Sequence, residues 1–460
     1  MLIFSWKAYL KWKKSGESCF PVFAILSFMY WLYYAVPLFL EERVISTIYE
    51  PVGHDLSENS ITKALLMSLV GVCSLWLGMN SGLTRSIVPK PSKIPFTLTR
   101  ANVRYVRAVL ITGSLLSLSD ISIFLFGEGG RQLISIILSV VPLLAFALLF
   151  RQVMQGEADL LDRLLVAGFV ATRFVTGLSS GWLGVFASIV LICGAIYIIE
   201  RRRLPRAAIV AVILFTLFFQ LGKEDFRRTY WQEQEAGQAS KIEKVGFWIQ
   251  ASLEKWGETI SESSGQSFRG ALMPSVTRVS LLNQTANVIE LTPAVVPYQN
   301  GQLYSYLLIT LIPRFVWPAK PSVNDSNRYY QVAYGLTAEE HLGNVSIAVG
   351  LLAEAFINFG WAGVVAIMFL VGVFFEFYQR AFLGKSSGAL MTGIGVILLP
   401  QFLSVESQMA QYLGGILQQV VVGFLVMLPI FRIGVLRKSF KLATPLSRSH
   451  RIAKPKIVEP

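Results

Sequence analysis

Blocks of about 20 consecutive apolar residues recur along the chain and constrain its fold more than any other feature. A helix of that length crosses a hydrocarbon layer ~30 Å thick. Hydrophobic residues make up 53% of the chain and charged residues only 15%, against about 25% charged residues in ordinary soluble proteins. The sequence therefore predicts an all-α polytopic membrane protein with about ten transmembrane helices. The expected spans are 20–40, 61–80, 107–126, 132–150, 160–177, 182–199, 206–222, 361–379, 386–404 and 412–431.

Lysine and arginine residues gather in alternate connections between these blocks and predict the orientation of the chain. The connections on the basic side are the N-terminal tail with Lys7 to Lys14, the acid-free segment 81–107, the turn 200–206 and the tail 432–460. The positive-inside rule places that side in the cytoplasm. We therefore expect both termini there, with the chain in the bacterial inner (cytoplasmic) membrane. The net charge of +13 then reflects orientation and contact with membrane lipids, not nucleic acid.

This orientation divides the chain into four parts. They are 1–222 with seven spans, the large extracytoplasmic and partly re-entrant loop 223–360, 361–431 with three spans, and the basic cytoplasmic tail 432–460. A loop as long as 223–360 is uncommon without a function of its own. Two stretches within it have apolar residues at helical spacing, which predicts amphipathic helices. We expect the chemistry of the protein in this loop.

The sequence contains no spacing of residues typical of a metal site or of a disulfide framework. The chain has three cysteines and three histidines. The cysteines fall in apolar blocks, and the histidines are not spaced like the ligands of a zinc site. We expect no metal and no cofactor.

The most distinctive polar cluster runs from Pro313 to Pro321. Three prolines within nine residues make the segment stiff, so Arg314 and Lys320 leave it in defined directions. Trp317 suits the level of the lipid headgroups. A guanidinium beside an ammonium at that depth would bind a lipid-linked diphosphate. The alternative is an interfacial anchor whose cations meet phospholipid headgroups.

A second basic cluster follows the seventh apolar block. Lys223 and Arg227 are four residues apart and would share one face of a continuing helix. Here the alternative is a collar of snorkelling cations with Glu224 and Asp225 as salt partners. Arg173, near the outer end of the fifth block, is costly in a membrane and needs a partner, a substrate or access to the surface.

The run Pro313-Arg314-Phe315-Val316-Trp317-Pro318-Ala319-Lys320-Pro321 resembles the O-antigen polymerase family of oligosaccharide repeat-unit polymerases (the Wzy type). The residues after it, Asn324, Asn327 and Tyr329, and the Lys223-x-x-Phe226-Arg227 pattern are similar in character. The chain departs from the family at Gly177–Trp182, where many relatives have an arginine in the turn between two spans. Arg173 lies one helical turn before that position.

The resemblance implies a GT-C-like glycosyltransferase at the outer face of the membrane. It would join undecaprenyl-diphosphate-linked oligosaccharide repeat units into O-antigen, capsule or exopolysaccharide, with a chain-length regulator and a flippase as further partners. Protein cations would stabilise the departing diphosphate without a metal, and Glu224, Asp325, His341 or Glu354 would act as the base. The catalytic candidates are Arg314, Arg227, Glu224, Glu354 and His341. The substrate-binding candidates are Lys223, Lys320, Arg173, Arg328, Trp317, Tyr329, Tyr330 and Asn324.

Two other functions fit a membrane protein of this kind. A ligase would move the glycan from the same carrier to a different acceptor. A transporter would be expected to show matched halves with broken helices, and the single late loop speaks against it.

Overall fold

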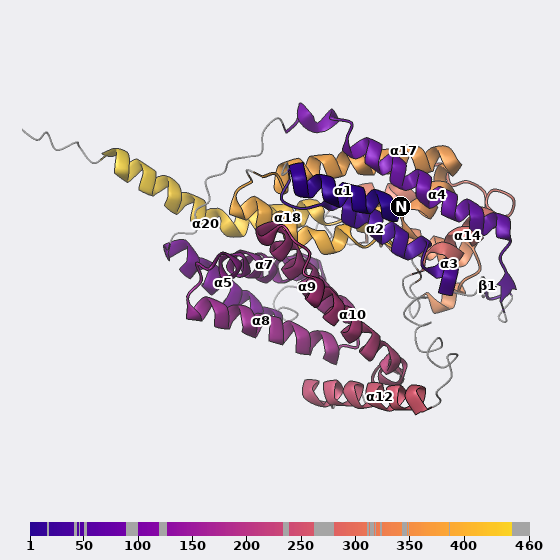
Figure 1. Ribbon diagram of the computed structural model, residues 1–460, viewed down its shortest axis with the longest axis horizontal. Coiled ribbons are helices and arrows are strands. Elements are labelled where there is room, and N and C mark those ends of the chain that lie inside the picture. The colour runs from indigo at the N-terminus through magenta and orange to yellow at the C-terminus, as the bar shows by residue number, and fades with distance from the viewer. Residues whose placement is uncertain are drawn as a thin grey trace, which may run out of the picture.

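The computed structural model describes residues 1–15, 18–40, 44–45, 47–49, 53–88, 100–118, 127–232, 239–261, 280–310, 312, 317, 319–322, 324–342, 347, 349–385 and 387–443. Nearly all of their regular structure is helical (Figure 1). The strands β1 (Val44–Ile45) and β2 (His54–Asp55) pair in antiparallel fashion as a two-residue ladder. The prediction of an all-α fold is therefore confirmed.

The helices of the first half are α1 (Leu2–Ser15), α2 (Val22–Tyr34), α3 (Pro37–Leu40), α4 (Glu58–Met79), η1 (Leu83–Arg85), α5 (Arg100–Leu118), α7 (Gly127–Gln155), α8 (Leu160–Ser179), α9 (Leu183–Arg201), α10 (Arg206–Leu221), α11 (Lys223–Arg227) and the π-helical turn η2 (Arg228–Gln232). Those of the second half are α12 (Lys241–Ser261), α14 (Leu282–Leu291), η4 (Gln302–Tyr304), α15 (Ser305–Thr310), α16 (Asp325–Ala333), η5 (Glu339–His341), α17 (Gly350–Phe382), α18 (Ala389–Phe402), α19 (Met409–Leu413) and α20 (Ile416–Ala443).

Six helical segments among the described residues are long and apolar enough to cross a membrane, which is compatible with a multi-pass membrane protein. They are Val22–Phe39, Glu58–Arg85, Ile134–Gln155, Leu183–Arg201, Gly350–Phe382 and Met409–Pro429. A seventh results if α10 and the following helix to Trp231, bent by 58° at Gly222, form one span. The prediction of ten spans is therefore wrong for the part of the chain that the structure describes.

Three of the predicted spans explain why the sequence predicts more membrane-spanning helices than the structure shows. Helix α8 coincides with 160–177 but carries Asp162, Arg163 and Arg173. Helix α18 has only 14 residues, a length of about 21 Å, which falls short of the hydrocarbon core. Helix α5 has several arginines in its first half and ends at Leu118, and 119–126 lies outside the described residues. The apolar blocks were correctly read as helices, but not every such helix is a span.

The helices form two packed groups. Helices α1, α2, α4, α14 and α17 make one group, and α5, α7, α8, α9, α18 and α20 make the other, with α7 at its centre. Contacts between α17 and α18 join the two groups (Figure 1). One continuous apolar core, which includes Met368 of α17 and Leu148 of α7, runs through both.

Helices α4 and α17 pack backbone against backbone. A Cβ atom added at Gly78 would lie 2.0 Å from the carbonyl oxygen of Phe369, and one added at Gly372 would lie 2.2 Å from that of Leu75. The absence of side chains at these two glycines lets the helices approach closely, as small residues do between membrane helices. This is the most extensive helix pair in the structure.

Helix α17 bends at Gly360, which has φ 62° and ψ −151°. That conformation is open to glycine and disfavoured for other residues. The half before the bend, Gly350–Phe359, falls within 345–359, which the sequence predicts to be a re-entrant dip of the outer loop. In the structure this half is helical and leads across the bend into the predicted span 361–379, and α17 packs against α14 and η4. The re-entrant dip stays a prediction.

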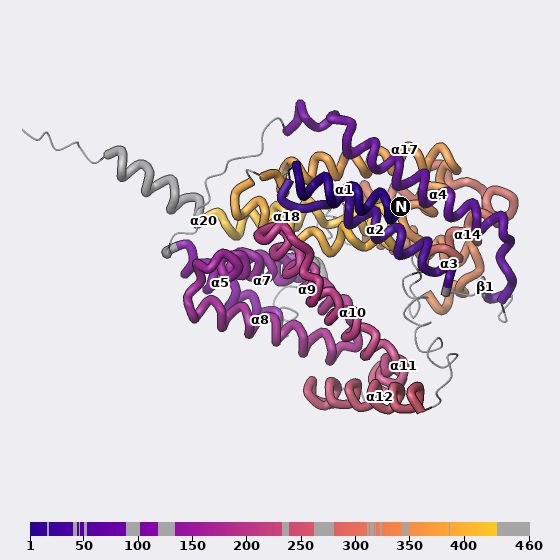
Figure 2. Tube along the Cα trace, viewed as in Figure 1, coloured from indigo at the N-terminus to yellow at the C-terminus, as the bar shows by residue number. Residues whose placement is uncertain are grey.

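Helices α10, α11 and α12 form an arm that leaves the second group (Figure 2). Its separate apolar cluster is built from Leu178, Phe219, Phe226 and Trp248. Helix α12, one of the two predicted amphipathic helices, packs on α8, α10 and α11. The other predicted amphipathic helix is α14, while 262–279 lies outside the described residues.

We predict that Gly78→Ala destabilises the protein although alanine favours helix formation. The added methyl group would overlap the Phe369 carbonyl, and such overpacking costs about 1–3 kcal/mol. The measurement is the melting temperature of the purified protein in detergent. The matched control is Gly194→Ala in α9, where an added Cβ meets no atom within 4 Å. Equal melting temperatures for the two variants would contradict the close α4–α17 contact.

Candidate functional site

The predicted site residues fall into two separate places. Glu354, Lys320, Asn324, Arg328, Tyr329, Tyr330, His341 and Trp317 belong to α17 and to the segment 280–342 that packs on it, whereas Lys223, Glu224 and Arg227 belong to α11 on the arm. Arg314 lies outside the described residues. Figure 2 shows α11 and α12 well apart from α14 and α17. Glu354 of α17 and the candidates on α11 therefore lie in different parts of the described structure.

Glu354 is the most deeply buried of the predicted charged residues that the structure describes, with 1% of its surface exposed. Its Oε2 accepts a hydrogen bond of 2.7 Å from the backbone N–H of Met409, the first residue of α19. Its Oε1 is also buried and has no hydrogen-bond partner among the described residues. A carboxylate oxygen without a partner in such a place is costly, which marks it as a position for chemistry or for a bound polar group.

A phenol lies near this carboxylate. The Tyr304 hydroxyl is buried and has no hydrogen-bond partner among the described residues. Burial raises the pKa of Tyr304 above its ordinary value, and the negative charge of Glu354 raises it further, so the phenol stays protonated at neutral pH. The backbone around it is held by Asn358, whose Oδ1 accepts from Gly301 N–H at 3.0 Å.

The stretch 408–411 links the carboxylate to α16. The Gln408 side chain donates to Asn327 Oδ1 at 2.7 Å and accepts from the Ser326 hydroxyl at 2.9 Å. Gln411 Nε2 donates to Asn324 Oδ1 at 2.5 Å. Met409, between them in the chain, contacts Glu354. We call this set, Glu354, Tyr304, Asn324, Ser326, Asn327, Gln408 and Gln411, the polar junction.

The glutamines of the polar junction were missed by the sequence analysis. Gln401, outside the polar junction, was missed as well. Its Nε2 donates to the carbonyls of Gln411, Tyr412 and Gly414 at 2.8–2.9 Å and so holds the end of α19. The available signal was the occurrence of several glutamines within the apolar region 386–431, where an amide needs a partner.

Lys320 is buried, with 7% of its surface exposed. Its ammonium donates to the carbonyl oxygens of Ile309 and Ile312, at 3.4 and 2.8 Å, just at and beyond the end of α15. These bonds anchor the proline-rich segment to α15. Trp317, three residues earlier, is 39% exposed.

The remaining candidates of this group differ in burial. Tyr330 is fully buried and its ring lies 5.3 Å from that of Tyr334, while Tyr329 is half-buried. Arg328 pairs with Asp325 at 3.0 Å on the exposed side of α16. The His341 side chain is 61% exposed, with its Nδ1 4.0 Å from a carboxylate oxygen of Glu340.

The second basic cluster, Lys223 and Arg227, lies on α11 of the arm. Helix α11 puts Lys223 and Arg227 on one helical turn, as predicted, and buried Phe226 fixes the helix against Trp248. The Arg227 guanidinium lies 4.4 Å from the ring centroid of Trp231, a cation–π contact that orients it. Glu224 is exposed.

Of the two acids expected as salt partners in the alternative reading of this cluster, Asp225 pairs with Arg228 at 3.0 Å. Arg173, on α8, lies over the ring of Phe169 at 5.2 Å.

The chemistry available is that of a buried acid, phenols, amides and separated cations. No three side chains of His, Cys, Asp or Glu lie together as metal ligands in the described part of the chain. Metal independence stays a prediction.

No curated protein and no solved structure matches the chain. With six or seven spans instead of ten and no similar solved structure, the GT-C-like architecture implied by the resemblance is not supported. The model of one family, a domain of unknown function (DUF8712), matches residues 51–441. That range extends from just before β2 to the end of α20 and includes both the polar junction and the arm. The chain belongs to the DUF8712 family.

Proposed function

We propose that this protein is a glycosyltransferase that joins oligosaccharide repeat units carried on a lipid diphosphate, at the outer face of the bacterial inner membrane. The observation that carries the proposal is the polar junction. It holds a buried acid with an unpaired oxygen beside the segment that contains the Pro313–Pro321 motif. The resemblance of that motif to O-antigen polymerases supplies the substrate class.

The proposed reaction is a displacement at the anomeric carbon of the donor sugar. The acceptor hydroxyl gives its proton to the Glu354 carboxylate and its oxygen forms the new glycosidic bond. The bond between the sugar and the diphosphate breaks, and the diphosphate leaves with the electron pair. Arg314 and the Lys320 segment stabilise that charge.

Two basic clusters suit a reaction with two lipid-linked substrates. The diphosphate of the growing chain is released during the transfer, whereas that of the new repeat unit, the acceptor, stays attached. In this proposal the Pro313–Pro321 segment binds the first and α11 binds the second, where Arg227 is held by Trp231 and Lys223 is on the same turn.

The test of the function is the lipid-linked glycan profile of a bacterium that lacks the gene. Accumulated single repeat units support the polymerase. Full-length chains that stay on the carrier would indicate a ligase instead, and an unchanged profile would reject glycan transfer.

We predict that Glu354→Gln abolishes chain extension without unfolding the protein. The glutamine carbonyl oxygen can still accept from Met409 N–H, but an amide cannot take up a proton. The loss of a general base costs about 100-fold or more in rate. Rate and melting temperature are measured on the same preparation, with Glu376→Gln at the other end of α17 as the matched control. A Glu354→Gln variant with the wild-type rate would rule out this base.

We predict that Arg227→Ala lowers the rate at limiting acceptor concentration about 10-fold or more, because a hydrogen bond to a charged group, here the diphosphate that stays on the acceptor, contributes about 1.5–3 kcal/mol. Arg227→Lys restores little, because an ammonium lacks the planar fork that stacks on Trp231 and binds phosphate in bidentate fashion. The control is Arg228→Ala, which removes the adjacent cation, 66% exposed and paired with Asp225. Equal rates for Arg227→Ala and Arg228→Ala would dismiss the role of Arg227.

We predict that extension of lipid-linked units continues in excess EDTA at nearly the rate seen with divalent ions. The diphosphate is already an activated leaving group, and protein cations stabilise it. Purified protein and radiolabelled lipid-linked substrate provide the measurement. Activity that disappears in chelator and returns with Mg²⁺ would reject the cationic mechanism and leave the polymerase function standing.

A further inference from the structure

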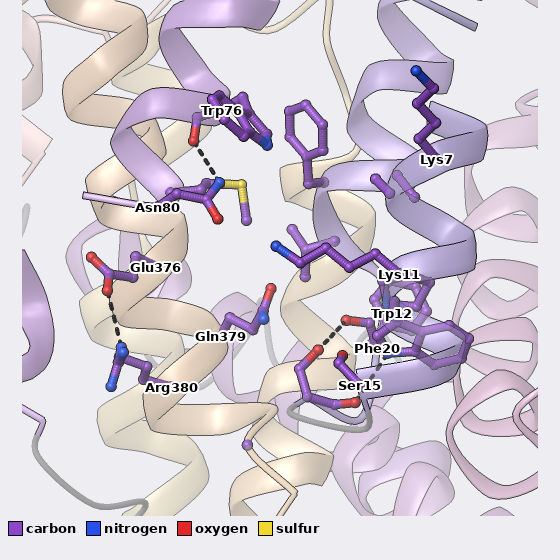
Figure 3. A pocket seen from close by; sticks show the side chains of 18 of the residues that line it. Lys7, Lys11, Trp12, Ser15, Phe20, Trp76, Asn80, Glu376, Gln379 and Arg380 are labelled. Atoms are coloured by element: carbon purple, nitrogen blue, oxygen red, sulfur yellow. Dashed lines mark hydrogen bonds and ion pairs between the residues drawn. The ribbon is translucent and has the colours of Figure 1, made fainter. Parts of the chain in front are cut away.

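A cavity of about 700 Å³ lies between α1, α2, η1 and the last turns of α4 and α17 (Figure 3). It is at the opposite end of α17 from Glu354, because its lining includes Glu376, Gln379 and Arg380. None of the residues assigned to glycan transfer lines it. The cavity is therefore a site distinct from the polar junction.

Cations dominate the polar side of this cavity. Lys7 and Lys11 come from α1, Arg85 from η1 and Arg380 from α17. Figure 3 shows the Lys11 side chain reaching across toward Gln379. No acid partner is recorded for Lys7, Lys11 or Arg85 within the described residues.

The acid among the described lining residues is already neutralised. Glu376 accepts from Arg380 Nε at 3.1 Å, from the Ser81 hydroxyl at 3.4 Å and from Thr84 N–H at 3.4 Å. The pair of Glu376 and Arg380 carries no net charge, which leaves the three cations Lys7, Lys11 and Arg85 unbalanced. Three positive charges around one cavity favour an anion there.

The other walls are apolar and aromatic. Phe4, Phe20, Phe23, Trp76 and Met79 line the cavity. Phe4, which lines the cavity from α1, is also 45% exposed. A cationic end beside aromatic walls fits a ligand with a negative head and an apolar chain, which a soluble anion does not have.

The position along the chain agrees with this ligand. The cavity borders the basic segment 81–107, which the charge distribution places at the cytoplasmic surface. Anionic lipids are concentrated in that leaflet, and basic pockets between membrane helices bind their headgroups.

We propose that this cavity binds the phosphate headgroup of an anionic membrane lipid, with Lys7, Lys11 and Arg85 as its ligands and the aromatic walls along its acyl chain. Bound lipid bridges α1 to the α4–α17 pair. The same phosphate chemistry could be supplied by a free phosphate ion, and the experiment separates the two sources.

The experiment titrates the purified, delipidated full-length chain with phosphatidylglycerol or with phosphatidylcholine of identical acyl chains, and counts bound lipid by native mass spectrometry. Phosphatidylglycerol is expected to bind at least tenfold more tightly. Lys7→Gln/Lys11→Gln should weaken it about fivefold for each cation removed. The matched control, Lys13→Gln/Lys14→Gln, removes two exposed lysines of the same helix that do not line the cavity and should leave the affinity unchanged.

Equal affinities for the two lipids, or equal losses in the two double variants, would overturn the proposal. Inorganic phosphate that binds with the same lysine dependence while phosphatidylglycerol does not would also overturn it, since the site would then take a soluble anion. If the Lys7→Gln/Lys11→Gln chain does not fold, Arg85→Gln on η1 makes the same test outside α1, with the same fivefold loss expected.

Discussion

The contact between α4 and α17 through Gly78 and Gly372 is the constraint on which both sites depend. The two long helices lie closer than a side chain at either glycine would allow. The residues at the ends of one helix are therefore fixed relative to those at the ends of the other. At one end, Ser57 N–H of the α4 cap donates to a carboxylate oxygen of Glu290 on α14, and α17 carries Glu354. At the other end, Asn80 and Gln379 face the basic cavity (Figure 3). A looser contact would disturb both regions together.

The segment 280–342 folds onto this helix pair through polar bonds as much as through apolar contact. Backbone N–H groups of Gln299 and Asn300 donate to the carbonyls of Ile357 and Asn358, near the bend of α17 at Gly360. Those carbonyls are available because the bend interrupts the helical hydrogen bonding there. The bend therefore provides the carbonyl groups to which residues 299–300 are hydrogen-bonded. These bonds bring the nearby Tyr304 toward Glu354. Buried polar groups that are satisfied in this way specify one arrangement, since any other would leave them unpaired.

The sequence predicts where the helices lie along the chain better than it predicts which of them span the membrane and which residues come into contact. Apolar runs locate the helices because the helical period and the burial of apolar surface are local properties. The number of spans is not a local property: α8 is a helix despite three charged residues, and α18 has only 14 residues, from Ala389 to Phe402. Glu354 could be identified as an unusual acid in an apolar region. Its partner Met409 is 55 residues away in the chain, and one sequence holds no information that joins them. The position of α11 apart from α17 could not be predicted for the same reason.

The division of cations between the arm and the proline-rich segment has a consequence for mechanism. A single cluster would bind one diphosphate and would have to exchange it at every cycle. In the proposed reaction, two clusters would hold a growing chain and a new unit at once, and movement of the arm about Gly222 would carry α11 with it. An added Cβ at Gly222 would lie 2.6 Å from Ser252 Oγ, so α12 is packed directly against this bend. Movement of α11 therefore requires movement of α12 with it, and the arm would act as one unit carrying its bound lipid toward or away from the polar junction.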